Sequence, residues 1–131
     1  MWKSIGAVIA GLVGWMLIVT IAGVVLRVSW PAYAQVASAM TFNLPMMIAR
    51  LSIGAVTTVA AGLVTAAIAR SSLMGLVLGV VLLILFIPQH VSLWDKFPVW
   101  YHLTFLSSLV PLTYAGGKIA ERGSPDAPAN A

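Results

Sequence analysis

The residues of this chain that could bind a ligand gather at one end of its apolar segments. They are Arg50, His90, Asp95 and His102. An arginine several residues inside an apolar run must extend to the lipid head groups, pair with a carboxylate or bind an anionic ligand. Asp95 is the only acid on that side of the predicted membrane segments. We therefore expect either a pair between Arg50 and Asp95 or an Arg50 side chain that reaches lipid phosphate, with an anionic ligand as the third possibility.

The two histidines are twelve positions apart across a connection, so both imidazoles are expected near one membrane face. Imidazole ligates haem iron and transition metals, and it titrates near neutral pH. This spacing is not specific for a metal, and a third ligand would have to be Asp95 or water. We therefore predict no metal site and no cofactor, and retain haem or metal binding by His90 and His102 as an alternative. If the two rings are close and partly buried, a proton-responsive pair is the other possibility.

Catalysis is not expected from the remaining residue types. The chain has no cysteine, which excludes disulfides and thiol chemistry. Asp95 has no second carboxylate beside it for acid/base work. No phosphate-binding glycine loop, serine-triad elbow or zinc-binding helix is present. The sequence thus favours a protein that is not an enzyme.

The segments that must position these residues are apolar and long. Four runs, residues 5–26, 51–69, 73–87 and 99–115, carry almost no charge. The first alone would span about 33 Å as a helix, against a hydrocarbon core of about 30 Å. The chain is 61% hydrophobic and 8% charged, whereas soluble domains carry about 25% charged residues. We predict an all-α membrane protein, a four-transmembrane-helix antiparallel bundle with a short interfacial helix in the first connection.

The expected helix bounds follow from residues that commonly start or end helices. Helices are predicted at about 3–28, 46–70, 72–88 and 98–117 in a single domain of residues 1–122, followed by a disordered tail of residues 123–131, rich in proline and small residues. Pro31 favours the start of the interfacial helix, with an irregular loop as the alternative. Ser71 and Ser72 predict a tight antiparallel hairpin. Pro88 should end or kink the third helix.

Four crossings would place both termini on one side of the membrane. Basic residues near that side are Lys3, Arg70, Lys118 and Arg122, and those near the other are Arg27, Arg50 and Lys96. The positive-inside rule then predicts that both termini are cytoplasmic. The first run is too long for a signal peptide, whose apolar core has about 7–15 residues, so we expect it to be retained. The connection of residues 87–102, dense in proline, tryptophan and histidine, predicts a structured cap where a ligand could bind.

Small residues at every fourth position predict close helix packing, because apolar contacts alone do little to join helices in lipid. The expected seams are Gly6, Ala10 and Gly14; Gly54, Thr58, Gly62 and Ala66; and Gly75 and Gly79. Polar side chains inside the segments, at Thr58, Thr65, Thr104 and Ser108, predict either packing contacts or a polar pathway. Pro111 leaves a backbone carbonyl without its amide partner, so the face with Thr104 and Ser108 is expected to point into the bundle or an oligomer interface.

These features favour a small multi-pass membrane protein with an accessory, interaction or membrane-organising role. A homo-oligomeric transporter or channel for small solutes is the alternative, and a haem- or metal-binding protein is the second. The expected partners are the lipid bilayer and a second copy or another membrane subunit. Nucleic acid is not expected, because the seven basic residues are scattered and form no patch.

Overall fold

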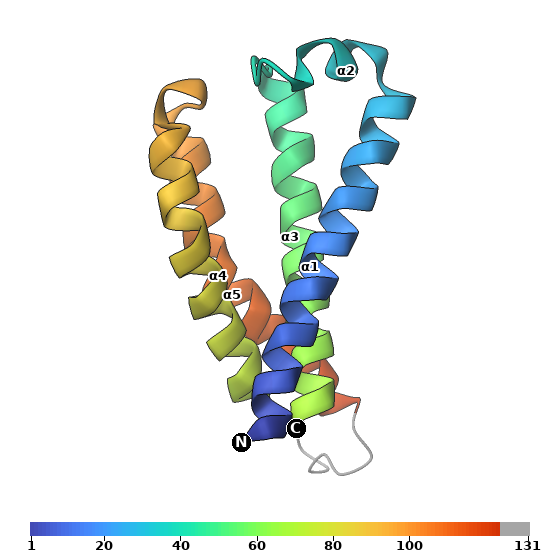
Figure 1. The fold of residues 1–131 in the computed structure, drawn as a ribbon, viewed down its shortest axis with the longest axis vertical. Helices are drawn as coiled ribbons and strands as arrows, with labels where there is room; N and C mark the ends of the chain where they lie inside the picture. Colours follow the sequence, from blue (N-terminus) through green and yellow to red (C-terminus); the bar gives the residue numbers. More distant parts are fainter. Residues whose placement is uncertain (124–131) are drawn as a thin grey trace.

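The structure is a computed structural model that describes residues 1–123. Its elements are α1 (Trp2–Ser29), α2 (Pro31–Ala37), α3 (Leu44–Ala69), α4 (Ser72–Ser92), a single 3-10 turn η1 (Trp94–Lys96) and α5 (Val99–Arg122). Figure 1 shows the long helices running side by side, with α2 lying across the end of α1 and α3. The all-helical prediction is confirmed. All but the first residue of the predicted tail lies outside the described residues.

Three helices, α1, α3 and α4, are long and apolar enough to cross a membrane. These three support the prediction of a membrane protein. Within the described part of the chain, α5 is not among the candidate spans, although it has 24 residues. Its first half is more polar, with His102, Thr104, Ser107 and Ser108.

Some helices begin or end at other residues than predicted, and the differences lie at capping residues and at a proline. Asn43 caps α3, its side chain accepting a hydrogen bond from the amide of Met46 at 3.1 Å, so α3 begins at Leu44. Pro88 does not end α4, which continues to Ser92. A membrane helix tolerates this because only one amide hydrogen bond is lost. In the turn between α3 and α4, Arg70 adopts a left-handed conformation (φ 56°, ψ 40°) that ends α3.

Glycines bring the backbones of α3, α4 and α5 into contact around Thr113, whose side chain is completely buried. A Cβ added to Gly62 would lie 2.7 Å from Thr113 Cα, and one added to Gly75 would lie 2.8 Å from the Thr113 carbonyl oxygen. On Gly116 it would overlap the carbonyl of Val59. No side chain fits at these positions, so glycine permits the close approach. This contact closes one end of the bundle.

The packing face of α1 differs from the predicted seam by one residue. Ala7, Gly11 and Trp15 are buried, whereas Gly6 and Gly14 have nothing within 4 Å of an added Cβ. The indole Nε1 of Trp15 donates to Thr58 Oγ1 at 3.1 Å. The hydroxyl of Thr65 donates to the carbonyl of Ala7 at 3.2 Å. These two hydrogen bonds between α1 and α3 select the face that α1 presents. The prediction of a Gly6–Ala10–Gly14 seam within the bundle was therefore wrong.

Toward the α2 end the helices diverge. Trp15, Phe86 and Phe105 meet in the middle of the bundle, with ring centroids 4.8 Å apart for the first two and 5.3 Å apart for the last two. These rings are too large for the backbone approach that glycine permits at the other end. Figure 1 shows α4 and α5 leaning away from α1 and α3 toward the α2 end.

We expect Gly116→Ala to lower the thermal unfolding midpoint of the purified protein in detergent. The added methyl group would overlap the Val59 carbonyl, and overpacking of this kind costs about 1–3 kcal/mol. Gly6→Ala is the matched control, because its Cβ would meet open space and alanine is favoured in helices by about 1 kcal/mol. Equal midpoints for the two variants would contradict the glycine contact.

Candidate functional site

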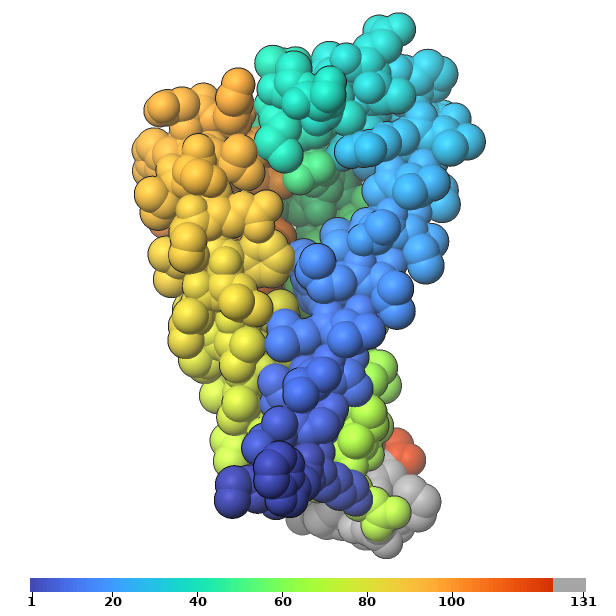
Figure 2. All heavy atoms as spheres, in the orientation of Figure 1, coloured from blue at the N-terminus to red at the C-terminus, as the bar shows by residue number. Residues whose placement is uncertain are grey.

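A cavity of about 730 Å³ lies between α1 and α4 toward the α2 end of the bundle. Figure 2 shows it from the outside as a recess between α1 (blue) and α4 (yellow to orange), with α3 (green) behind it. The recess opens sideways, across the helix axes. Its size falls within the range of about 300–1,000 Å³ that is usual for small-molecule pockets.

The walls of the cavity are apolar over most of their length. On α1 they extend from Leu12 to Leu26, fourteen helical rises of 1.5 Å or about 21 Å. On α4 they include Leu82, Leu85 and Phe86. Met16, Leu17 and Leu85 are each more than half exposed. They provide an apolar margin to the opening.

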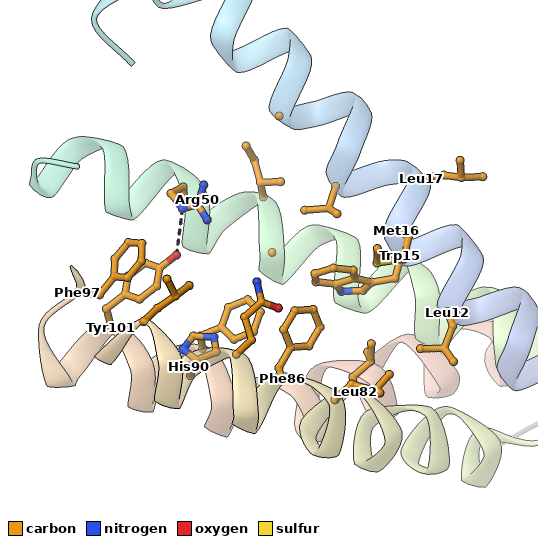
Figure 3. Close-up of a pocket in the computed structure, with 18 of the residues that line it drawn as sticks. Leu12, Trp15, Met16, Leu17, Arg50, Leu82, Phe86, His90, Phe97 and Tyr101 are labelled. Atoms are coloured by element: carbon orange, nitrogen blue, oxygen red, sulfur yellow. Dashed lines mark hydrogen bonds between the residues drawn. The ribbon is translucent and has the colours of Figure 1, made fainter. Parts of the chain in front are cut away.

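One end of the cavity is polar. Arg50, Gln89 and His90 line it there, together with the phenol groups of Tyr33 and Tyr101. In Figure 3, Arg50 and Tyr101 lie at one end, Leu12 and Leu82 at the other, and Trp15 and Phe86 between them. The cavity is therefore amphipathic along its length.

Arg50 is held by neutral aromatic residues. Its Nε donates to the hydroxyl of Tyr101 at 3.2 Å, and its Nη1 donates to the hydroxyl of Tyr33 at 2.8 Å. The guanidinium carbon lies 4.7 Å from the ring centroid of Phe42 and 5.8 Å from that of Phe97. We call these four residues the aromatic box. Cation–π contacts and two hydrogen bonds fix the guanidinium without neutralising its charge.

Asp95 does not pair with Arg50. It lies exposed on η1, and no ion pair joins the two side chains. The expected Arg50–Asp95 pair is therefore not formed. The half-buried Arg50 side chain is directed to the hydroxyls of Tyr33 and Tyr101. Its reach to lipid phosphate stays a prediction.

The two histidines form a buried pair that joins α4 to α5. Their Nδ1 atoms are 2.8 Å apart, and Nε2 of His102 lies 3.2 Å from the carbonyl oxygen of Trp94. A carbonyl only accepts, so Nε2 of His102 carries a hydrogen; in a neutral His102 ring, Nδ1 then accepts from Nδ1 of His90. His102 is completely buried and stacks on the Trp94 ring at 4.7 Å. The neutral His90 ring then has its Nε2 lone pair free beside the cavity.

This geometry bears on the metal alternative. The Nδ1 lone pair of His102 is directed at His90, so a metal ion or haem iron would have to displace that hydrogen bond. Among residues 1–123, no group of three or more histidine, aspartate or glutamate side chains is placed to hold a metal ion.

The other polar residues singled out from the sequence do not line the cavity. Thr58 and Thr65 are buried between helices and hydrogen-bonded there. Thr104 is exposed, and the hydroxyl of Ser108 donates to the carbonyl of Phe105 in its own helix at 2.8 Å. Pro111 is also exposed. Thr104 and Pro111 therefore do not point into the bundle. The other expectation for this face of α5, an oligomer interface, stays a prediction.

Sequence reasoning missed the aromatic box and the apolar walls of the cavity. Tyrosine and tryptophan near the ends of apolar segments commonly lie at the membrane interface, so the position of Tyr101 in the sequence does not by itself indicate a binding site. Phe42 and Phe97 lie in connections and gave no periodic signal. The available clue was an arginine inside an apolar run with several aromatic residues in the connections on the same side.

No protein-family model matches this chain, and comparisons with curated proteins and with solved structures find no significant similarity. The amphipathic cavity is the feature of the fold from which a function can be inferred.

We expect His102→Leu to destabilise the protein, because it leaves the Trp94 carbonyl and the His90 Nδ1 hydrogen without partners. An unsatisfied buried polar group costs about 1–3 kcal/mol. Thr104→Leu is the control, since that side chain is exposed two residues away on the same helix. Thermal unfolding in detergent measures both. If His102→Leu unfolded at the same midpoint as the wild type, the structural role of the histidine pair would be contradicted.

Proposed function

We propose that this protein is a four-span integral membrane protein that binds a lipid acyl chain, without catalysis, in the cavity between α1 and α4. The observation that supports this most directly is the shape and lining of the cavity: about 730 Å³, apolar along α1 and α4, polar at one end, and open to the side. Lipid binding of this kind suits an accessory or membrane-organising role.

Several features of α5 support a fourth crossing. Its 24 residues extend about 36 Å, which exceeds the hydrocarbon thickness of about 30 Å. It packs against α3 and α4 through Gly116 and Gly117. Its buried polar side chains, His102 and Thr113, are hydrogen-bonded. A helix with these properties can cross lipid although its hydropathy is lower than that of the other three.

The charges at the two ends of the bundle support an orientation. The start of α1, the end of α3, the start of α4 and the end of α5 lie at the closed end. Lys3, Arg70, Lys118 and Arg122 are at that end. The positive-inside rule places it, and both termini, in the cytoplasm. The α2 end and the polar end of the cavity would then be near the extracytoplasmic surface.

In this orientation the recess opens into the bilayer, because its mouth lies between two membrane-crossing helices. An empty apolar recess is unfavourable, since the atoms that line it lack contacts on one side. An acyl chain can enter from the surrounding lipid and fill it. Measured along α1, the cavity is about 21 Å long. The hydrocarbon layer of one leaflet is roughly 15 Å thick, so the cavity is long enough for an acyl chain.

The groups at the polar end are suited to binding and not to bond cleavage. No carboxylate of residues 1–123 lines the cavity, and His90 uses its Nδ1 to hold His102. The transport alternative depended on a polar path through Thr58 and Thr65, and both hydroxyls are occupied by contacts between or within helices. No specific observation favours that alternative.

The acyl-chain proposal predicts that Gly23→Phe reduces lipid retention. Gly23 lines the cavity and an added Cβ there meets nothing within 4 Å, so a benzyl group can fill the space without a clash. Gly14→Phe is the matched control, because Gly14 also has free space but does not line the cavity. Native mass spectrometry of gently extracted protein should show a lipid adduct in the wild type and in Gly14→Phe, and at least several-fold less in Gly23→Phe. A wild type without an adduct, or equal adducts in all three, would contradict the proposal.

The four-span topology predicts the sides on which introduced thiols react. The chain has no cysteine, so Ser38→Cys, next to α2, and Gly123→Cys, after α5, each give a single site. A membrane-impermeant maleimide should label Ser38→Cys in intact cells and Gly123→Cys only after permeabilisation. Labelling of both from the same side would mean that α5 does not cross.

A further inference from the structure

The positive charge of Arg50 is not neutralised by any acidic side chain among residues 1–123. Its four neighbours in the aromatic box are neutral, and Asp95 is not in contact with it. Arginines inside membrane segments generally pair with an acid or with backbone carbonyls. Partial burial of a charge carries a desolvation cost, and an anionic partner would offset it, so the half-buried Arg50 suits an anionic ligand.

The guanidinium of Arg50 also has N–H donors without an acceptor among the described residues. It carries five N–H groups, and the structure pairs two of them, one with Tyr101 and one with Tyr33. The Nη2 group has no acceptor in the described part of the chain, and Arg50 lines the cavity. The donors that remain suit the two oxygens of a carboxylate or phosphate group, which arginine binds in a fork.

The surroundings of Arg50 favour a small head group. Tyr33 on α2 and the stacked rings of Phe42 and Phe97 enclose the guanidinium. The ring centroids of Phe42 lie 4.9 Å from Tyr33 and 5.9 Å from Phe97. A carboxylate fits under such a cover more readily than a glycerophosphate with its attached second chain. The apolar walls lead away from Arg50 along α1 and α4, which suits the chain of a fatty acid bound there by its carboxylate.

We propose that the natural occupant of the cavity is a long-chain fatty acid whose carboxylate pairs with Arg50 and whose chain lies along α1 toward Leu12. This inference rests on the proposed function, since it requires that the cavity hold an acyl chain. The carboxylate completes the hydrogen bonding of the guanidinium and neutralises its charge. The aromatic box holds Arg50 in place for this contact.

The experiment compares palmitic acid with its methyl ester, which has the same chain and no charge. Binding of each to the full-length protein in detergent at pH 8 is measured by displacement of a fluorescent fatty acid. We expect the acid to bind wild type at least tenfold more tightly than the ester, because a charge-assisted fork is lost in the ester. Arg50→Gln should reduce this ratio to about one, and Arg50→Lys should restore part of it. Lys96→Gln is the control, since it removes a positive charge from the same end of the bundle without changing the cavity lining.

Each outcome separates this inference from the proposed function. Equal affinities for acid and ester in wild type would overturn the fatty-acid assignment and leave acyl-chain binding intact, and this comparison does not depend on whether Arg50 variants fold. Stronger displacement by phosphatidic acid than by palmitic acid would also overturn it, in favour of a phospholipid phosphate. If neither probe binds and extracted protein has no lipid adduct, both the inference and the proposed function are wrong.

Discussion

The contact of three backbones around Thr113 is the constraint on which the rest of the structure depends. In lipid, apolar side chains gain little by leaving their surroundings, so helices associate where their backbones can approach closely. Gly62, Gly75 and Gly116 permit that approach at one end. Larger residues at Trp15, Phe86 and Phe105 prevent it further along. A bundle closed at one end and occupied by aromatic rings in its middle must diverge at the other, and the cavity is the result.

Specific polar contacts hold the diverging end together where close packing cannot. The His90–His102 pair joins α4 to α5, and Arg50 joins α3 to α2 and α5 through two tyrosine hydroxyls. These contacts lie on the rim and at the end of the cavity. The residues that stabilise the open end are thus also the ones that a ligand would meet. Stability and binding are coupled at this end of the bundle. The neutral partners of Arg50 hold helices together through it and leave its positive charge available to a ligand.

The sequence predicted features that depend on composition and local chemistry, and missed those that depend on helix orientation. Long apolar runs, the α3–α4 turn and the proximity of the two histidines could be inferred because each follows from length, spacing or topology. The packing face of α1 could not be inferred, because the stripe of small residues that begins at Gly6 lies one position from the buried stripe of Ala7, Gly11 and Trp15. The hydrogen bond that Trp15 donates to Thr58 and the one that Thr65 donates to Ala7 decide between them. The partners of Arg50 were missed because its neighbours come from two connections and a distant helix.

The proposed function depends on a recess between α1 and α4 that is filled by an acyl chain. An experimental structure of the protein in lipid nanodiscs tests this most directly. We predict elongated density that begins at the guanidinium of Arg50 and continues between α1 and α4 toward Leu12. Side chains of α1 and α4 packed against each other along their whole length, with no space between them, would contradict it.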